Sequence, residues 1–378
     1  MAPRGAAALY LDWNATTPIA PEARGAMLAA MDDGWANPAS VHGEGRRARA
    51  HVEDARQAVA VLLGLDPRDV LFTSGGTEAN NVALRSFVGA GDGLVTSRLE
   101  HPSVVRTAEA LAGAGARVAW VEPTADGLIE VPRVLDALAT LGDAARLVSL
   151  QAVNHETGVV QPVSGLADAL ASRPGRPVLL HTDAVQATGR LDRSAWAGAD
   201  IVSVASHKLR GPKGAGAVAT RPGVKLAGLL TGGEQERGVR PGTQDPVVLA
   251  GFGAAARRAV GGPARYAAIG ALRDTLEAAL VAAGGVRNGG EPRAPHVTNL
   301  SFSGWSGPEL CAALDLEGLC VSSGSACSAG TAEPSPVITA MLGRARAASA
   351  VRISLGETSN AAEISAAAQI FLRVLARS

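Results

Sequence analysis

Short apolar segments alternate with helical patterns from residue 70 to about residue 220. Each apolar segment has the length of a buried strand, and the residues between these segments repeat with the spacing of an amphipathic helix. This order is typical of strands joined by helical crossovers, so it predicts an α/β fold around a mostly parallel sheet. The candidate strands are residues 69–73, 92–97, 116–122, 146–153, 177–184, 200–206 and 216–220.

A different pattern begins after residue 255. A long helical pattern covers residues 264–284, and short strand-like segments then alternate with helices, which is typical of a smaller α+β domain. The chain of 378 residues also exceeds the roughly 250 to 300 residues at which a single hydrophobic core stops growing. We therefore predict a large domain at residues 15–255, a small domain formed by residues 1–14 and 256–378, and a cleft between them.

The charge balance excludes some classes of partner. The formal net charge is zero, from 35 basic and 35 acidic residues, so no direct binding to nucleic acid or to a membrane surface is expected. No apolar stretch approaches the ~18 residues of a membrane-spanning helix. The three cysteines are an odd number and no signal pattern begins the chain, so we expect a cytoplasmic protein without a disulfide scaffold.

Polar and titratable residues follow five of the candidate strands directly. Because the carboxyl ends of parallel strands form one rim of an open sheet, we expect these residues to converge on one ligand site. They are residues 74–77, 100–101 and 154–156, Asp183 with Gln186, and residues 206–208.

Residues 73–78 read Thr-Ser-Gly-Gly-Thr-Glu where a strand passes into a helix. Glycines let the backbone approach an anion, and N–H groups at a helix start can bind it, so Gly76 and Thr77 belong to a candidate phosphate cup. The alternative is an ordinary helix start with Thr77 as its N-cap. The segment has neither a P-loop lysine nor a dinucleotide-binding glycine spacing, so the phosphate should belong to a smaller ligand.

Lysine is rare in this chain, because only three of the 35 basic residues are lysines. One of them, Lys208, follows the candidate strand 200–206, where a desolvated amine can bind a carbonyl compound covalently; the alternative is a surface lysine. Asp183 could hold a ring nitrogen in its protonated form. A phosphate cup, an amine and a carboxylate are the groups that pyridoxal phosphate needs, so the sequence predicts this cofactor and no metal.

Short motifs follow one another in a characteristic order along nearly the whole chain. They lie at residues 10–12, 14–18, 37–40, 72–81, 100–101, 181–186, 207–214, 236–243 and 322–328. In this order they resemble the NifS/IscS-like cysteine desulfurases, within the class V aminotransferase family. The resemblance implies an aspartate aminotransferase-like fold (fold type I), pyridoxal phosphate, a homodimer, and conversion of L-cysteine to L-alanine with transfer of the sulfur to an acceptor protein.

The resemblance also implies roles for individual residues. Lys208 would hold the cofactor covalently, Asp183 would face the pyridine nitrogen, and Gln186 would face the phenolic oxygen. His101 would stack on the ring and, with Lys208, move protons. The phosphate would be bound by Gly76, Thr77 and His207, by Ser206 in place of a serine that is common at position 205, and by Thr243 of the partner subunit.

The remaining roles concern the substrate. Arg352 offers a planar fork that pairs with a carboxylate through two hydrogen bonds, and Asn37 would assist it. Cys327, in a loop of small residues, would attack the substrate sulfur and carry it as a persulfide. Cys311 and Cys320 have apolar neighbours and are expected to be buried core thiols.

The sequence departs from the family pattern at three positions. His155 replaces an asparagine that would bond the phenolic oxygen, and an ordinary imidazole there would titrate near pH ~6.5. Ala205 replaces a serine, and Glu234 interrupts a glycine run. Two alternatives stay open, another pyridoxal-phosphate-dependent lyase or aminotransferase and a persulfide-carrying subunit with low turnover. The sulfur acceptor is open among a cluster scaffold, a tRNA-thiolation enzyme and a molybdenum-cofactor pathway.

Overall fold

The structure, a computed structural model, describes residues 8–324 and 333–377. A seven-stranded sheet in the order β2-β8-β7-β6-β5-β3-β4 forms its centre. Neighbouring strands are parallel except where β8 pairs with β2 and with β7, so the predicted mostly parallel sheet is confirmed. The strands are β2 (Val70–Thr73), β3 (Gly93–Ser97), β4 (Arg117–Val121), β5 (Ala145–Ser149), β6 (Leu179–Asp183), β7 (Ile201–Ala205) and β8 (Gly216–Thr220).

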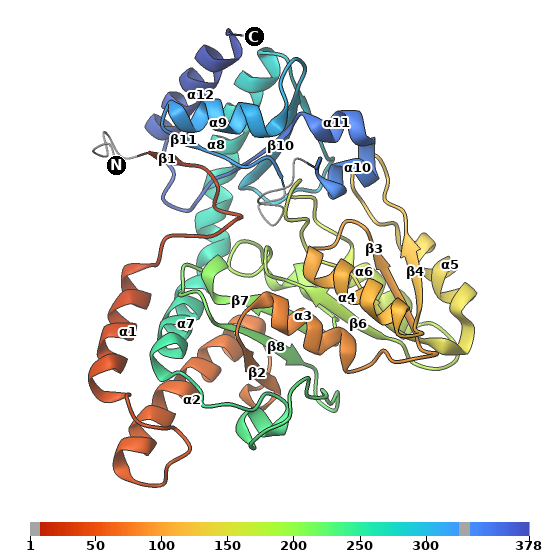
Figure 1. Ribbon diagram of the computed structural model, residues 1–378, viewed down its shortest axis with the longest axis vertical. Helices are drawn as coiled ribbons and strands as arrows, with labels where there is room; N and C mark the ends of the chain where they lie inside the picture. The colour runs from red at the N-terminus through yellow and green to blue at the C-terminus, as the bar shows by residue number, and fades with distance from the viewer. Residues whose placement is uncertain (1–7, 325–332, 378) are drawn as a thin grey trace.

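Helices bury both faces of this sheet, which explains why its strands read as continuous apolar runs. Successive side chains point to opposite faces, so Leu71 packs with α3 and α4 whereas Phe72 belongs to the core on the other face. Helix α1 lies beside α2 and α7 (Figure 1). The helices are α1 (Pro21–Asp33), α2 (Gly43–Leu63), α3 (Gly76–Arg85), α4 (Pro102–Gly113), α5 (Val131–Leu141), α6 (Val163–Ala171) and α7 (Pro246–Ala259).

Five short 3-10 turns connect these elements in the described part of the chain. The fourth of them follows β7 directly and carries Lys208. They are η1 (Pro67–Asp69), η2 (Gly142–Ala144), η3 (Arg193–Trp196), η4 (Ser206–Lys208) and η5 (Gln235–Gly238).

A smaller part of the molecule, at the top of Figure 1, has its own antiparallel sheet in the order β12-β10-β9 and its own apolar core. The first strand of the chain, β1, pairs here with β11. This mixture of helices and strands agrees with the predicted smaller α+β domain, and the exact domain boundaries stay a prediction. The elements are β1 (Leu9–Tyr10), α8 (Gly262–Ala282), β9 (Gly285–Arg287), β10 (Val297–Phe302), α9 (Gly307–Leu316), β11 (Leu319–Cys320), α10 (Pro336–Leu342), α11 (Arg344–Ala348), β12 (Ala350–Ser354) and α12 (Ala361–Leu375).

Candidate active site

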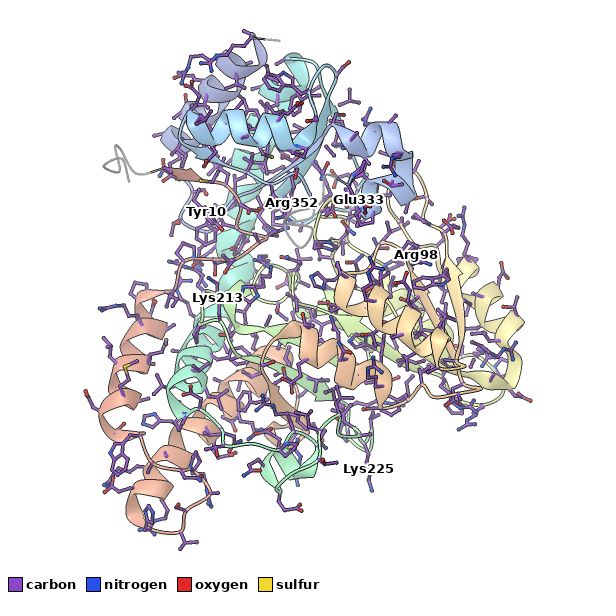
Figure 2. All side chains as sticks on the ribbon, in the orientation of Figure 1. Tyr10, Arg98, Lys213, Lys225, Glu333 and Arg352 are labelled. Carbon is purple, nitrogen blue, oxygen red and sulfur yellow. The ribbon has the colours of Figure 1, made fainter. Side chains whose placement is uncertain are left out.

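A cavity of about 300 Å³ lies between the carboxyl ends of the large sheet's strands and the smaller part. Residues from all five predicted strand ends line it, so their expected convergence on one rim is confirmed. Gly324 and Arg352 line it from the smaller part, and Figure 2 shows Arg352 on the side that faces the large sheet. The predicted site residues in its wall are Gly76, Thr77, His101, His155, Asp183, Gln186, His207, Lys208 and Arg352.

Lys208 is held at the cavity by the N-terminal segment. Its Nζ donates a hydrogen bond to the backbone oxygen of Ala15 at 2.8 Å and another to the backbone oxygen of Asn14. The side chain is half-buried in the cavity wall, so the alternative of a surface lysine is wrong. The amine is therefore placed where a ligand in the cavity can meet it.

Asp183 ends strand β6 and is buried. Its Oδ2 accepts a hydrogen bond from Nδ2 of Asn80 at 2.7 Å, and its Oδ1 accepts one from the backbone N–H of Val185 at 3.0 Å. These two bonds fix the plane of the carboxylate. Asn80 is absent from the predicted site, although it lies in the motif at residues 72–81, because an asparagine within a helix gives no local signal of burial.

His101 is the N-cap of α4, and its Nδ1 accepts a hydrogen bond from the backbone N–H of Ser103 at 3.1 Å. A neutral imidazole whose Nδ1 accepts carries its proton on Nε2. Burial lowers the pKa of His101, and of the nearby charges Asp183 raises it whereas Lys208 lowers it. His101 is therefore a neutral imidazole at neutral pH.

The ring of His155 meets the ring of His101 edge-on, with the ring centroids 5.5 Å apart. Burial lowers the pKa of His155 well below its ordinary value, and the nearby cations Arg352 and Lys208 lower it further. The expected titration near pH ~6.5 is therefore wrong, because it assumed an ordinary imidazole exposed to water. His155 presents a neutral ring to the cavity.

Helix α3 begins at Gly76, and its N-cap is Gly75. The alternative of Thr77 as the N-cap is therefore wrong. Gly75 offers no capping side chain, and the carboxylate of Glu78 in the first turn accepts from the N–H of Ser74, before the helix. The N–H groups of the first turn therefore remain available to an anion. His207 also lines the cavity, with its Nδ1 3.1 Å from Oγ1 of Thr16. The segment keeps the geometry that a phosphate cup needs.

Ser206 is buried but does not face the cavity. A Cβ added at Gly211 would come within 2.2 Å of the Oγ of Ser206, so this hydroxyl points at Gly211. Ala205 lines the cavity instead. The proposed replacement of the common phosphate-binding serine by Ser206 is therefore not supported by the orientation of its side chain.

Three further predicted residues are not in the cavity wall that the structure describes. Asn37, in the loop between α1 and α2, is exposed, and its Oδ1 accepts a hydrogen bond from the backbone N–H of Ala39 at 2.9 Å. Thr243 is exposed just before α7. Cys327 lies outside the described residues, and Gly324, the nearest described residue before it, lines the cavity.

Arg352 lies on β12 and is buried. Its Nη2 donates a hydrogen bond to Oδ1 of Asp12 at 2.7 Å, and its Nη1 donates one to the backbone oxygen of His155 at 3.1 Å. Asp12 and the neighbouring Asn14 have no role in the sequence prediction, because their partners lie some 340 and 141 residues further along the chain. The N-terminal segment therefore supplies part of the wall.

Two buried carboxyl groups without a predicted role also line the cavity, those of Glu100 and Glu156. Burial raises the pKa of Glu100 well above its ordinary value, although its Oε1 accepts a hydrogen bond from the N–H of Gln151 at 2.8 Å. Burial also raises the pKa of Glu156 to about 6, and its Oε2 accepts a hydrogen bond from Oγ of Ser335 at 2.6 Å. The cavity therefore contains carboxyl groups that ionise less readily than exposed ones.

Cys311 and Cys320 are half-buried, so the expectation that both are buried core thiols is wrong. Cys311 packs at the edge of the smaller apolar core, and burial raises its pKa to about 12. Burial also raises the pKa of Cys320, as does Asp315, whose Oδ1 is 3.8 Å from its Sγ. Neither thiol is readily ionised at neutral pH, so neither has the property of a nucleophilic cysteine.

The cavity suits pyridoxal phosphate. An amine at Lys208, a carboxylate at Asp183 and a helix start at Gly76 form the donor set that this cofactor uses. Buried polar atoms are normally paired, so orphaned atoms in the residues of the wall indicate a polar ligand. Within the described part of the chain, the atoms without a hydrogen-bond partner include Oδ1 of Asn80, Oε2 of Glu100, Nδ1 of His155 and Nε of Arg352.

The described residues contain neither a candidate metal site nor a candidate membrane span. No three His, Cys, Asp or Glu side chains among them are placed to hold a metal ion. No helix in this part of the chain is both long and apolar enough to cross a membrane.

Comparison with known sequences gives full-length similarity. The family described as aminotransferase class-V matches residues 9–366. A cysteine desulfurase of Cereibacter sphaeroides is 41% identical over 366 residues, which cover 94% of this chain and 92% of that protein. A cysteine desulfurase IscS of Aeromonas salmonicida (strain A449) is 39% identical over 370 residues, which cover 94% of this chain and 90% of that protein.

Solved structures agree with the sequence relatives. A structure described as a NifS-like protein has a TM-score of 0.89 at 29% identity and covers 98% of this chain and 100% of its own. A structure described as SspA in complex with cysteine has a TM-score of 0.76 at 29% identity and covers 92% of this chain and 98% of its own. The chain therefore belongs to the class V aminotransferase family of pyridoxal-phosphate enzymes and, within it, to the NifS/IscS-like cysteine desulfurases.

Proposed function

We propose that this enzyme converts L-cysteine to L-alanine and passes the sulfur, as a persulfide of Cys327, to an acceptor protein. One observation carries the proposal. Lys208 and Asp183 line the cavity from the large sheet, and Gly324, which leads into the segment that contains Cys327, lines it from the smaller part. The segment that contains Cys327 therefore follows a residue in the wall of the same cavity that Lys208 lines.

The cavity residues have tasks that their contacts support. Bound pyridoxal phosphate supplies a ring that withdraws electrons from the α-carbon of the substrate. The carboxylate of Asp183, fixed by Asn80, would keep the ring nitrogen protonated. The amine of Lys208 would hold the cofactor until the substrate amine displaces it, and would then take the proton of the α-carbon and later return it. The Nε2–H of His101 would donate a hydrogen bond to the reacting region.

Binding of the phosphate and of the substrate carboxylate completes the proposed site. The N–H groups at the start of α3 bind the phosphate together with His207. Arg352 binds the substrate carboxylate, and Asp12 holds its guanidinium in place. The role of Asn37 beside it stays a prediction. The homodimer that the family resemblance implies, in which Thr243 of the partner subunit completes the phosphate cup, stays a proposal, and the exposure of Thr243 outside this cavity is consistent with it.

The sulfur step uses Cys327 as the nucleophile. Its thiolate attacks the sulfur of the bound substrate, so an S–S bond forms while the C–S bond breaks. The electron pair of the broken bond stays with the β-carbon of the substrate. This carbon takes up a proton and becomes the methyl group of alanine. The raised pKa values of Cys311 and Cys320 support Cys327 in this role.

The test uses the purified protein loaded with pyridoxal phosphate and supplied with L-cysteine. Alanine should form, and a reductant should release sulfide. Cys327→Ser should keep the absorbance of the bound cofactor but form no alanine or persulfide, whereas Cys311→Ser should remain active. An alkylating tag should locate the persulfide on Cys327 by mass spectrometry.

The same experiment separates the alternatives. Formation of an oxo acid in place of alanine would indicate an aminotransferase. A persulfide that forms only when a second desulfurase is present would indicate a sulfur carrier with little turnover of its own. Addition of candidate acceptors, a cluster scaffold or a thiolation enzyme, would then show which protein takes the sulfur.

A further inference from the structure

Arg190 is a buried cation next to the cavity wall, with 2% of its surface exposed. A buried guanidinium is normally paired with a carboxylate, because desolvation of an unpaired charge is costly. Among the described residues no carboxylate forms an ion pair with Arg190, and its hydrogen bonds go to oxygens of neutral groups. The position of these oxygens shows what the side chain holds in place.

The guanidinium of Arg190 joins two segments that line the cavity. Its Nη1 donates a hydrogen bond to Oε1 of Gln186 at 2.8 Å and longer ones, at 3.3 Å, to the backbone oxygens of Val185 and Gln186. Its Nη2 donates to the backbone oxygen of Lys208 at 3.2 Å. One side chain therefore links the loop after β6 to the turn η4.

These contacts fix the direction of the Gln186 amide. A glutamine side chain has an oxygen that accepts and a nitrogen that donates, and either can face a neutral polar neighbour. A guanidinium has donors only, so the atom of Gln186 that faces Arg190 must be the oxygen. The nitrogen then donates to the backbone oxygen of Asn14 at 3.1 Å, an acceptor that favours the same orientation, and Gln186 lines the cavity.

We propose that Arg190 is a positioning residue that makes Gln186 a hydrogen-bond donor, and not an acceptor, toward the phenolic oxygen of the cofactor. The proposal rests on the cofactor site of the proposed function. A donor at this place stabilises negative charge on the phenolic oxygen, whereas an amide oxygen would repel it. Arg190 thus acts on the cofactor's electronic state through Gln186.

The test compares three variants of the full-length protein. Arg190→Met removes the donors but keeps much of the volume, Arg190→Lys keeps a donor-only group, and Gln186→Leu removes the amide. The readouts are the ratio of the absorbance bands of bound pyridoxal phosphate at fixed pH, the dissociation constant of the cofactor, and the melting temperature of the protein stripped of cofactor.

Arg190→Met should change the band ratio in the direction that Gln186→Leu changes it and weaken cofactor binding about tenfold, since a buried hydrogen bond to a charged group is lost. Arg190→Met should leave the band ratio of the Gln186→Leu variant unchanged, because the amide on which Arg190 acts is then absent. Arg190→Lys should restore the wild-type ratio. If Arg190→Met does not fold, Arg190→Gln serves in its place, because an amide can also accept a hydrogen bond and so removes the requirement for an oxygen that the donor-only guanidinium imposes on Gln186.

A control is Arg273, another buried arginine that donates to backbone oxygens, those of Ala294 and Val297, in the smaller part, although it also pairs with Asp274. Arg273→Met should lower the melting temperature without a change in the band ratio. The proposal is overturned if the Arg190 variants behave like this control. It is equally overturned if Arg190→Met changes the band ratio as much in the Gln186→Leu background as in the wild type. If the Arg190 variants form no alanine but keep the wild-type band ratio, the proposed role of Arg190 is wrong. This result would not contradict the desulfurase reaction of the wild-type enzyme.

Discussion

At the scale of single residues, contacts and not residue types decide what the cavity side chains do. The strand-end pattern predicts Asp183, because a carboxylate after an apolar run is a local signal. It does not predict Asn80, whose bond to Asp183 joins positions 103 residues apart. The same holds for Asp12, which meets Arg352 across the fold. Residues whose role comes from long-range contacts leave no pattern in a single sequence.

Burial also changes titration in ways that residue identity does not reveal. The pKa of Glu156 rises to about 6 in the folded protein. Between its ordinary value near ~4.5 and about 6, the folded state holds a proton that the unfolded state has lost, so stability falls as the pH rises through this window. Glu156→Gln should remove that loss and make the protein more stable than wild type by about 2 kcal/mol at pH ~7.

Urea unfolding of both proteins between pH 4 and pH 7 measures this difference. Below pH ~4.5 the two free energies of unfolding should approach each other, because the wild-type carboxyl is then protonated in both states. Glu122→Gln, at an exposed position, serves as the control and should change the free energy of unfolding by less than about 0.5 kcal/mol. A constant difference between Glu156→Gln and wild type at every pH would contradict the assigned titration.

At the scale of elements, strand positions are well predicted and strand directions are not. Each of the seven candidate strands overlaps a strand of the large sheet, because burial on both faces gives most of these strands an apolar run. An apolar run reads the same in both directions, so the antiparallel orientation of β8 leaves no signal. Strand β9 has no apolar run that could predict it, because two of its three residues are exposed.

The contact between β8 and the start of α3 predicts an effect of substitution at Gly216. A Cβ there would lie 2.6 Å from the backbone of Gly75 and 2.8 Å from the backbone oxygen of Val204. Backbone atoms cannot give way easily, so Gly216→Ala should displace the N-cap of α3 and destabilise the protein by about 1–3 kcal/mol. Binding of pyridoxal phosphate should weaken as well, because the displaced helix start forms the phosphate cup.

Thermal unfolding and equilibrium dialysis with the cofactor measure these two effects. Gly25→Ala is the matched control, because Gly25 lies within α1 with no atom near its Cβ position. Alanine is the better helix former, so this variant should be more stable by about 0.5–1 kcal/mol and bind the cofactor normally. Weaker binding in Gly216→Ala without any loss of stability would show that the steric account is incorrect.

At the scale of the whole molecule, the smaller part is joined to the Lys208 turn by ion pairs around Glu357. This buried carboxylate, after β12, accepts hydrogen bonds from Arg210 at 2.8 Å, Arg258 at 2.6 Å and Arg265 at 2.7 Å. Arg210 follows Lys208 closely and has a left-handed backbone with φ of 67°, which is unfavourable for a non-glycine residue. The ion pairs therefore help to hold a strained turn that carries the amine.

Glu357→Gln should lower the stability of the protein by about 1–3 kcal/mol, because three partly buried arginines lose their shared anion. Burial alone would raise the pKa of Glu357, but hydrogen bonds from Arg258, Arg210 and Arg265 hold it below its ordinary value. The carboxylate therefore stabilises the fold above pH ~4.5, and its contribution is lost as the pH falls through its lower pKa in the folded state.

Calorimetry should show a difference in stability between variant and wild type that is complete at pH 7 and disappears in acid. The ion pair of Glu317 with Arg377 at the surface is the control, and Glu317→Gln should leave the stability of the protein nearly unchanged. Equal costs for the two substitutions, or a gap at Glu357 that persists in acid, would show that the cluster does not join the smaller part to the turn electrostatically.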